Sequence, residues 1–194
     1  MAYAEFLSAV DILVRIVTEL PDVPTAARRE LLNQKATAVV EARAGVAVLG
    51  PPTVLCRVEE VAKQCAELEK LALRRAVLRS AISALEAAWC PRNAEWCRDP
   101  HHNSAHVAWK LLAEWGRLED EERWEKLDLL EFTLQESHAL EAEQVRQVLD
   151  VANSVAHWDE MIGGFIRDPL LERFQAVRDA FVDAAYGSLD SPVA

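Results

Sequence analysis

The chain has 194 residues, of which 51% are apolar, 27% are charged and only 6 are glycine. These proportions are typical of a globular domain, and they exclude disordered, collagen-like and low-complexity chains. Acidic residues outnumber basic residues by 32 to 21, which gives a formal net charge of −11. Because such a surface repels phosphate backbones and anionic lipid headgroups, we expect neither nucleic acid nor membrane to be a partner.

The first twenty residues are rich in apolar side chains but are interrupted at helical intervals by charges, which are Glu5, Asp11, Arg15 and Glu19. A signal peptide has an unbroken apolar block, so we interpret this segment as an amphipathic helix of the mature fold. No run of apolar residues is long enough to predict a membrane span. Four cysteines do not make a disulfide scaffold in a chain of this length, so we expect a reduced, cytoplasmic protein.

Apolar residues recur with the period of an α-helix along the whole chain, and the sequence therefore predicts an all-α bundle of about seven helices. The first helix ends before Pro21, and its predicted inner stripe contains Leu7, Val10, Leu13, Val14, Val17 and Leu20. The second helix runs from about residue 25 into the low forties, where Arg43 interrupts its stripe. That stripe contains Leu32, Ala36, Val39 and Val40. The segment 50–52, Gly-Pro-Pro, then predicts a firm break.

One long helix is predicted over about residues 53–89, and at about 1.5 Å per residue it would be about 55 Å long. Its first half has the alternating spacing of a coiled-coil seam, formed by Val54, Val58, Val61, Cys65, Leu68 and Ala72. The seam fails at Arg75 and resumes with Leu78, Ile82, Leu85 and Trp89. Either the helix bends near Arg74 and Arg75, or it forms the spine of a homodimer.

A loop over residues 90–103 separates two predicted subdomains, an aliphatic one at 1–89 and a tryptophan-containing one at 104–186, with a flexible tail at 187–194. All six tryptophans lie between Trp89 and Trp158. Further helices are expected at about 104–118, 120–136, 141–157 and 169–186, with a turn at 137–140. The inner stripe of the helix at 120–136 is predicted to be Trp124, Leu127, Leu130 and Leu134. The predicted inner stripe of the helix at 141–157 is Val145, Val148, Leu149, Ala152 and Val155. That of the helix at 169–186 is Leu170, Phe174, Val177, Phe181 and Ala185.

The loop and the start of the next helix hold a cluster of residue types that bind zinc, namely Cys90, Cys97, His101, His102 and His106. A structural zinc site needs four thiolate or imidazole ligands, and we take Cys90, Cys97, His102 and His106 as candidates. His102 and His106 would share one face of a helix, but Pro100 and Asn103 predict that His102 precedes the helix. A disulfide, or a half-buried cysteine pair beside solvated histidines, is the alternative.

A run of acids, Glu119 to Glu122, is followed by Glu125 and Asp128, and the segment 119–143 contains ten acids and two bases. Carboxylates three residues apart on a helix could hold Mg²⁺, as in helical pyrophosphohydrolases, if a facing helix supplied a second set. Candidates for that set are Glu141, Glu143, Asp159 and Glu160. We prefer a solvated or partner-binding face that includes Glu121, Glu122 and Glu125.

Two other features suggest partner binding. Arg74, Arg75 and Arg79 lie within a few turns of the long helix and could recognise an acidic surface. Trp96 in the loop and Trp109 at the edge of its helical stripe are candidate exposed indoles, which often mark interfaces. Ser154 and His157 are three residues apart on one predicted helix and do not form a catalytic triad by spacing alone.

We therefore expect a non-enzymatic, cytoplasmic protein-interaction or adaptor module that requires no cofactor. The first alternative is a metal-dependent helical enzyme that uses the acidic residues at 119–128 with Mg²⁺ or the Cys/His cluster with zinc. The second alternative is a small-ligand sensor whose pocket is lined by tryptophans.

Overall fold

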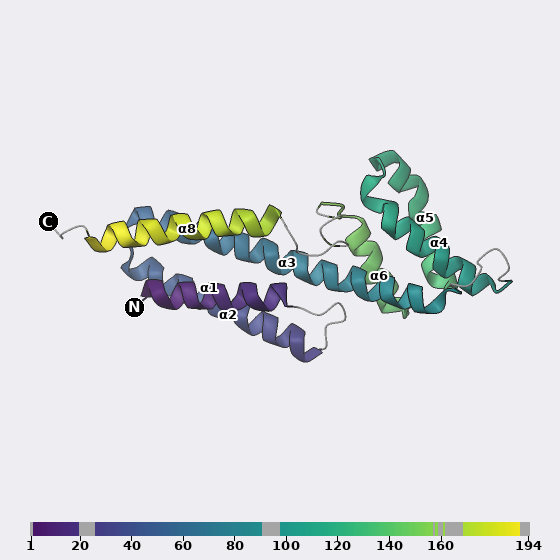
Figure 1. Cartoon of the computed structure of the whole chain (residues 1–194), viewed down its shortest axis with the longest axis horizontal. Coiled ribbons are helices and arrows are strands. Elements are labelled where there is room, and N and C mark those ends of the chain that lie inside the picture. Colours follow the sequence, from purple (N-terminus) through teal and green to yellow (C-terminus); the bar gives the residue numbers. More distant parts are fainter. Residues whose placement is uncertain are drawn as a thin grey trace. The chain divides into compact units, whose positions relative to one another are not determined.

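The computed structural model describes residues 2–19, 26–90, 98–156, 158, 161 and 169–190. Within these residues the chain forms seven α-helices and a 3₁₀ turn and contains no strand, which confirms the predicted all-α bundle. The elements are α1 (Ala2–Thr18), α2 (Ala26–Leu49), α3 (Pro52–Ala88), α4 (Pro100–Glu114), η1 (Trp115–Arg117), α5 (Asp120–Glu136), α6 (Ala142–Ala152) and α8 (Pro169–Asp190) (Figure 1). The single long helix, α3, is present as predicted.

Contacts divide the chain into two compact units. Unit 1 comprises Met1–Leu73 and Gly164–Ala194, and unit 2 comprises Arg74–Gly163. These units differ from the predicted subdomains in two respects. The division falls within α3, next to the two arginines where the predicted seam is interrupted, and helix α8 belongs with the N-terminal helices.

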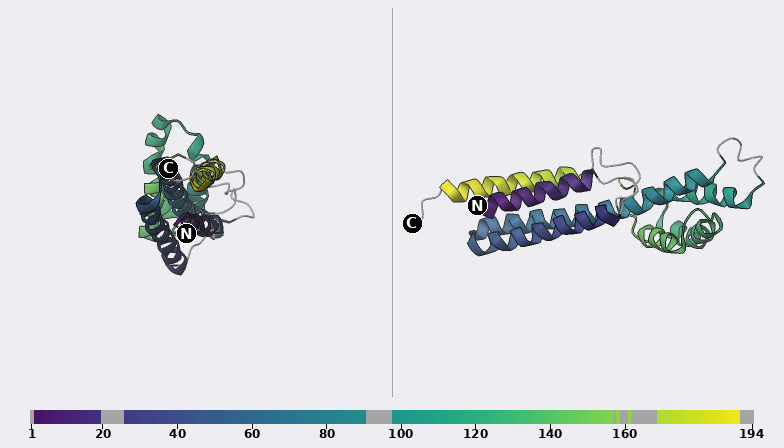
Figure 2. Two further views of the ribbon diagram at one scale, coloured as in Figure 1. Left: turned by 90° about the vertical axis from the view of Figure 1, so that its left-hand side faces the viewer. Right: turned by 90° about the horizontal axis from the view of Figure 1, so that it is seen from below.

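Unit 1 is a bundle of α1, α2, the first part of α3, and α8, which run alongside one another (Figure 2). Phe6 of α1 meets Phe181 of α8 edge to face, with the ring centroids 5.3 Å apart. Arg178 lies one turn before Phe181 in α8, and Asp11 follows Phe6 in α1. The Arg178 guanidinium donates two hydrogen bonds to the Asp11 carboxylate, at 2.8 and 2.9 Å. These contacts place α8 antiparallel to α1 and explain why it joins the N-terminal unit.

The core of unit 1 follows the predicted stripes with three corrections. All six predicted seam residues of α3, from Val54 to Ala72, are buried within the chain. In α1 the stripe begins at Phe6 rather than Leu7. Helix α2 continues to Leu49 and buries Val46, so the prediction that the helix ends in the low forties, where Arg43 interrupts its stripe, is wrong. Arg43 lies at the edge of that face because its guanidinium pairs with Glu59 of α3 at 3.2 Å. The third correction is Val40, which is exposed rather than buried.

Unit 2 is built around two buried tryptophans that join segments far apart in the sequence. The indole N–H of Trp115 donates to the carbonyl of Ala152 at 2.9 Å, and that of Trp158 donates to Leu112 at 3.0 Å. Gly116 allows this packing, because a Cβ atom there would lie 2.8 Å from two carbon atoms of Trp158. Helix α6 ends at Ala152, five residues before its predicted end, and Asn153 caps it.

Helix α4 begins at Pro100, four residues earlier than predicted. The Asp99 side chain accepts a hydrogen bond from the His101 backbone N–H at 2.9 Å, which makes Asp99 the N-cap, and Pro100 takes the first helical position. The same hydrogen bond holds the pKa of Asp99 below its ordinary value. The expectation that His102 precedes the helix is therefore wrong, and His102 and His106 share one helix.

Candidate functional site

Helix α5 begins with a cluster of acids that is held by local hydrogen bonds. The backbone N–H of Glu119 donates to the Glu122 carboxylate at 3.2 Å, which is the arrangement of a capping box. Arg123 folds back and donates to the carbonyl of Leu118 and to the Asp120 carboxylate. Acids in this first turn also complement the helix dipole. The carboxylate of Glu122, a predicted partner-binding residue, therefore accepts a hydrogen bond within the chain at the start of α5.

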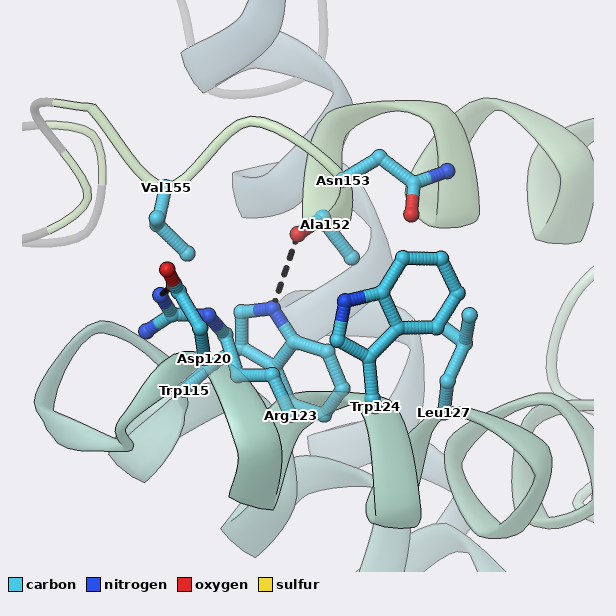
Figure 3. Close-up of a pocket in the computed structure, with 8 residues that line it drawn as sticks. All are labelled: Trp115, Asp120, Arg123, Trp124, Leu127, Ala152, Asn153 and Val155. Carbon is cyan, nitrogen blue, oxygen red and sulfur yellow. Dashed lines mark hydrogen bonds and ion pairs between the residues drawn. The ribbon is translucent and has the colours of Figure 1, made fainter.

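The side of α5 that faces the core is narrower than the sequence predicts. Leu130, Thr133 and Leu134 are buried, and Leu127 is half-buried. Trp124, which was expected to lie in the inner stripe, is 75% exposed, so that expectation is wrong. The physical reason is that Trp115 already fills the core at this level, fixed by its hydrogen bond to Ala152, and Trp124 stands outside it (Figure 3).

The opposite side of α5 presents large apolar side chains to solvent. Trp124 is 75% exposed, Phe132 is 58% exposed and Leu129 is 46% exposed. At about 100° per residue these three positions span an arc of about 140° around the helix. The same arc contains four exposed acids, namely Glu121, Glu125, Asp128 and, in the last turn of the helix, Glu136. We call Glu121, Trp124, Glu125, Asp128, Leu129 and Phe132 the α5 face.

The six residues of the α5 face form two parallel rows along the helix, each with a spacing of four residues. One row is Glu121, Glu125 and Leu129, and the other is Trp124, Asp128 and Phe132. Rows with this spacing are the ridges that helices use when they pack against each other, and the line between them is a groove. The two bases of α5, Arg123 and Lys126, lie outside the arc of this face by the same helical geometry.

A small pocket lies beside Trp124 at the start of α5 (Figure 3). Its cavity measures about 110 Å³, and it is lined by five apolar residues, Trp115, Trp124, Leu127, Ala152 and Val155, and by the polar residues Asp120, Arg123 and Asn153. Sites for whole small ligands are usually about 300–1,000 Å³, whereas a cavity of about 150 Å³ accepts a benzene molecule. The pocket is therefore of a size for one aliphatic side chain. Because Trp124 lines the pocket and is also exposed, it joins the pocket to the α5 face.

The predicted metal ligands have separate neighbours in the structure. The His106 ring packs edge to face on Trp89, with the centroids 4.6 Å apart, and His102 lies 3.8 Å from the Asp99 carboxylate. Cys90 is half-buried, and Cys97 lies outside the described residues. Among the described residues, no three histidines, cysteines or acids are grouped to hold a metal ion. The zinc hypothesis, which needs Cys97, stays a prediction.

His101 has a structural partner that the sequence did not indicate. Its ring stacks on His138 with the centroids 4.1 Å apart, and its Nδ1 atom lies 2.7 Å from the carbonyl of Glu136. His138 occupies the turn after α5 with a φ of 52°, a left-handed conformation that is uncommon outside glycine. This contact joins the start of α4 to the end of α5.

Trp109 belongs to an aromatic cluster rather than to an open surface. Its indole N–H donates to the Glu86 carboxylate at 3.0 Å, and its ring meets Trp89 edge to face at 4.9 Å. Trp96, the other candidate indole, lies outside the described residues. Among the tryptophans that the structure describes, Trp124 is the exposed one, and the sequence pattern does not predict this. A sequence pattern that points to an exposed apolar surface on α5 is the presence of Leu129 and Phe132 outside the predicted inner stripe. One stripe of a helix cannot bury both sets of apolar residues.

The remaining predicted residues are placed as follows. Arg74, Arg75 and Arg79 are half-buried in unit 2, and the last two take part in interactions within the chain. Glu141 caps helix α6 through Gln144, and Glu143 pairs with Arg146. Ser154 is half-buried, whereas His157, Asp159 and Glu160 lie outside the described residues.

A larger hollow lies in unit 1, between α1, α2 and α3. It has a volume of about 540 Å³, and among its lining residues are Val40, Lys63, Cys65 and Glu69. No tryptophan lines it, so it is not the pocket expected of the sensor hypothesis. Burial raises the pKa of the Cys65 thiol to about 12 and also raises the pKa of the Glu69 carboxyl.

No family model, curated protein or solved structure matches this chain. Within the described ranges, none of the helices has both the length and the apolar character needed to span a bilayer. The function of the chain is therefore inferred from its own residues.

Proposed function

We propose that this chain is a non-enzymatic protein-interaction module and that the α5 face is its docking surface. The observation that carries the proposal is the exposure of three large apolar side chains, Trp124, Leu129 and Phe132, on one helix. Single exposed apolar residues are common on protein surfaces, but three large ones within one arc of about 140° on a single helix favour an interaction site. A helix face with anchors at this spacing suits docking against another helix.

Covering this face would remove a large apolar area from water. An aromatic side chain buries about 150–250 Å² when fully covered, and burial contributes about 25 cal/mol per Å². With exposures of 75% and 58%, Trp124 would gain about 3–5 kcal/mol and Phe132 about 2–4 kcal/mol on being covered. Association itself costs about 4–15 kcal/mol, which is of the same size as this gain, so the complex also depends on the apolar surface that the partner buries. We therefore expect a weak, reversible complex.

The acids of the face have a second role in the unbound chain. Glu121, Glu125 and Asp128 separate the apolar side chains and give the face a uniform negative charge. Like charges disfavour non-specific association of two copies through this surface. The face can therefore keep its apolar anchors in water until a complementary partner covers them.

The test places a photo-crosslinking amino acid at Phe132 and, as the control, at Val48, which is 83% exposed on α2. Crosslinking in cells that express the chain identifies the partner, which is then purified and titrated calorimetrically. We expect the variant W124A/L129A/F132A to bind this partner at least tenfold more weakly than wild type. The matched variant V40A/V48A, which removes two exposed apolar side chains elsewhere, should bind normally.

Stability measurements separate loss of the surface from loss of the fold. Because the three truncated side chains are exposed, the unfolding free energy should change by about 0.5 kcal/mol or less for each. Unchanged affinity of the purified partner for W124A/L129A/F132A would overturn the proposal. Adducts from Phe132 that match those from Val48 would overturn it as well.

A further inference from the structure

We infer that the partner of the α5 face is a cationic amphipathic helix from another protein, with an aliphatic anchor that enters the pocket beside Trp124. This inference rests on the proposed function and adds the chemistry of the partner. It follows from the geometry of the two rows, the sign of the charge on the face, and the size of the pocket.

The geometry favours a helix as the incoming element. The rows Glu121–Glu125–Leu129 and Trp124–Asp128–Phe132 leave between them a groove that is inclined by about 26° to the axis of α5, which is 17 residues long. Side chains of a second helix can lie along such a groove over several turns. An extended strand would need free backbone hydrogen-bonding groups on α5, and a helix interior offers none.

The charge of the face selects a basic partner. In the part of the chain that the structure describes, none of the carboxylates of Glu121, Glu125 and Asp128 is ion-paired. Of the two bases of α5, Arg123 is already paired with Asp120, and Lys126 lies outside the arc of the face. Lysines or arginines that flank an apolar stripe would pair with these acids at the rim of the interface. The same acids repel phosphate groups, which disfavours nucleic acid and anionic lipid as occupants.

The pocket gives the partner one fixed anchor point. Its volume of about 110 Å³ admits one leucine or isoleucine side chain, which would contact Trp115, Leu127 and Val155. The paired side chains of Asp120 and Arg123, together with Asn153, form the polar part of the lining. Trp115 is only 1% exposed and is held by its hydrogen bond to Ala152, so the floor of the pocket is rigid. Trp124 can cover the anchor from the side, and a rigid floor with an aromatic cover is typical of an interface hot spot.

The test uses a synthetic peptide of about the same length as α5, with leucines on one helical face and lysines at its edges. Calorimetry with the full chain measures its affinity, and circular dichroism measures the helix that it gains on binding. Control peptides have the same composition in scrambled order, glutamate in place of lysine, or alanine in place of the central leucine. We expect micromolar binding of the first peptide and at least tenfold weaker binding of each control.

Two protein variants separate charge from apolar contact. E121Q/E125Q/D128N keeps the apolar residues and should bind about tenfold more weakly, with little remaining dependence on salt. The control E41Q/E67Q/D183N removes the same charge from exposed positions in unit 1 and should bind as wild type does. Equal weakening by both charge variants would overturn the inference, because attraction to the net charge alone would then explain binding.

The outcomes distinguish failure of the inference from failure of the proposed function. If the partner found by crosslinking needs Trp124, Leu129 and Phe132 but binds E121Q/E125Q/D128N normally, the docking surface stands and the cationic helix is refuted. If sedimentation shows that the chain self-associates and W124A/L129A/F132A abolishes this, the occupant is a second copy, which also refutes the inference.

Discussion

Replacing Gly116 with alanine should destabilise unit 2, although the same change usually stabilises a helical turn. The new Cβ atom would lie 2.8 Å from two carbon atoms of Trp158, whereas carbon atoms in contact prefer about 3.5–4.0 Å. Overpacking of this kind costs about 1–3 kcal/mol, and the lower backbone entropy of alanine returns about 0.4–1 kcal/mol. We therefore expect a net loss of about 1–2 kcal/mol.

Gly45 provides a matched control, because it lies in α2 and a Cβ atom there would meet nothing within 4 Å. G45A should gain about 0.4–1 kcal/mol, so one substitution has opposite signs at two sites. Urea unfolding followed by tryptophan fluorescence reports unit 2, since all six tryptophans lie within it. Circular dichroism reports both units. A G116A variant as stable as wild type, or more stable, would refute the close packing of Trp158 on this turn.

Three further predictions concern buried groups. W115F should lose about 2–3 kcal/mol in urea unfolding, because it leaves the buried carbonyl of Ala152 without its donor and empties part of the core. Cys65, whose pKa is raised to about 12, should carry about a thousandfold less thiolate at pH 8 than a thiol of pKa 9.0. Mass spectrometry after brief alkylation should therefore find exposed Cys56 modified and Cys65 unmodified, and rapid labelling of Cys65 would contradict its burial. Burial raises the pKa of Glu69 in the folded chain above the ordinary value of 4.5. At a pH above the folded-state pKa the ionised carboxylate destabilises the fold, whereas at a pH below 4.5 the group is protonated in both states and has no such effect. E69Q should thus be more stable than wild type at pH 7 and equal to it near pH 4, and equal stability at both would exclude a desolvated carboxylate.

Periodicity alone predicted the all-α fold and most of the core. The seam from Val54 to Ala72 is buried as expected, because each step of three or four residues returns to the same side of a helix. The predicted start of α4 is four residues late, because Asn103 and Ser104 resemble a helix start while Asp99 supplies the actual cap. The sequence does carry this cap, since an aspartate followed by proline is typical of an N-cap and a first helical residue, but apolar periodicity alone does not choose between the two starts.

The candidate site was only partly predictable. The acids at 121–128 were identified from composition, but Trp124 was assigned to the core because it continues the spacing of Leu127 and Leu130. Its exposure depends on Trp115, which occupies the same part of the core from another helical turn. Competition between two residues for one place is a tertiary effect, and local sequence patterns do not reveal which residue is displaced.

The most direct test of the α5 docking surface is acrylamide quenching of tryptophan fluorescence, measured with and without the lysine–leucine peptide. Trp124 is 75% exposed, whereas Trp115 and Trp158 are 1% and 2% exposed, so Trp124 should contribute strongly to quenching in the free chain. We predict that the peptide protects this indole in wild type and gives no further protection in W124F. The same protection in both proteins, or protection in neither while the peptide is bound, would place the partner elsewhere and contradict the account.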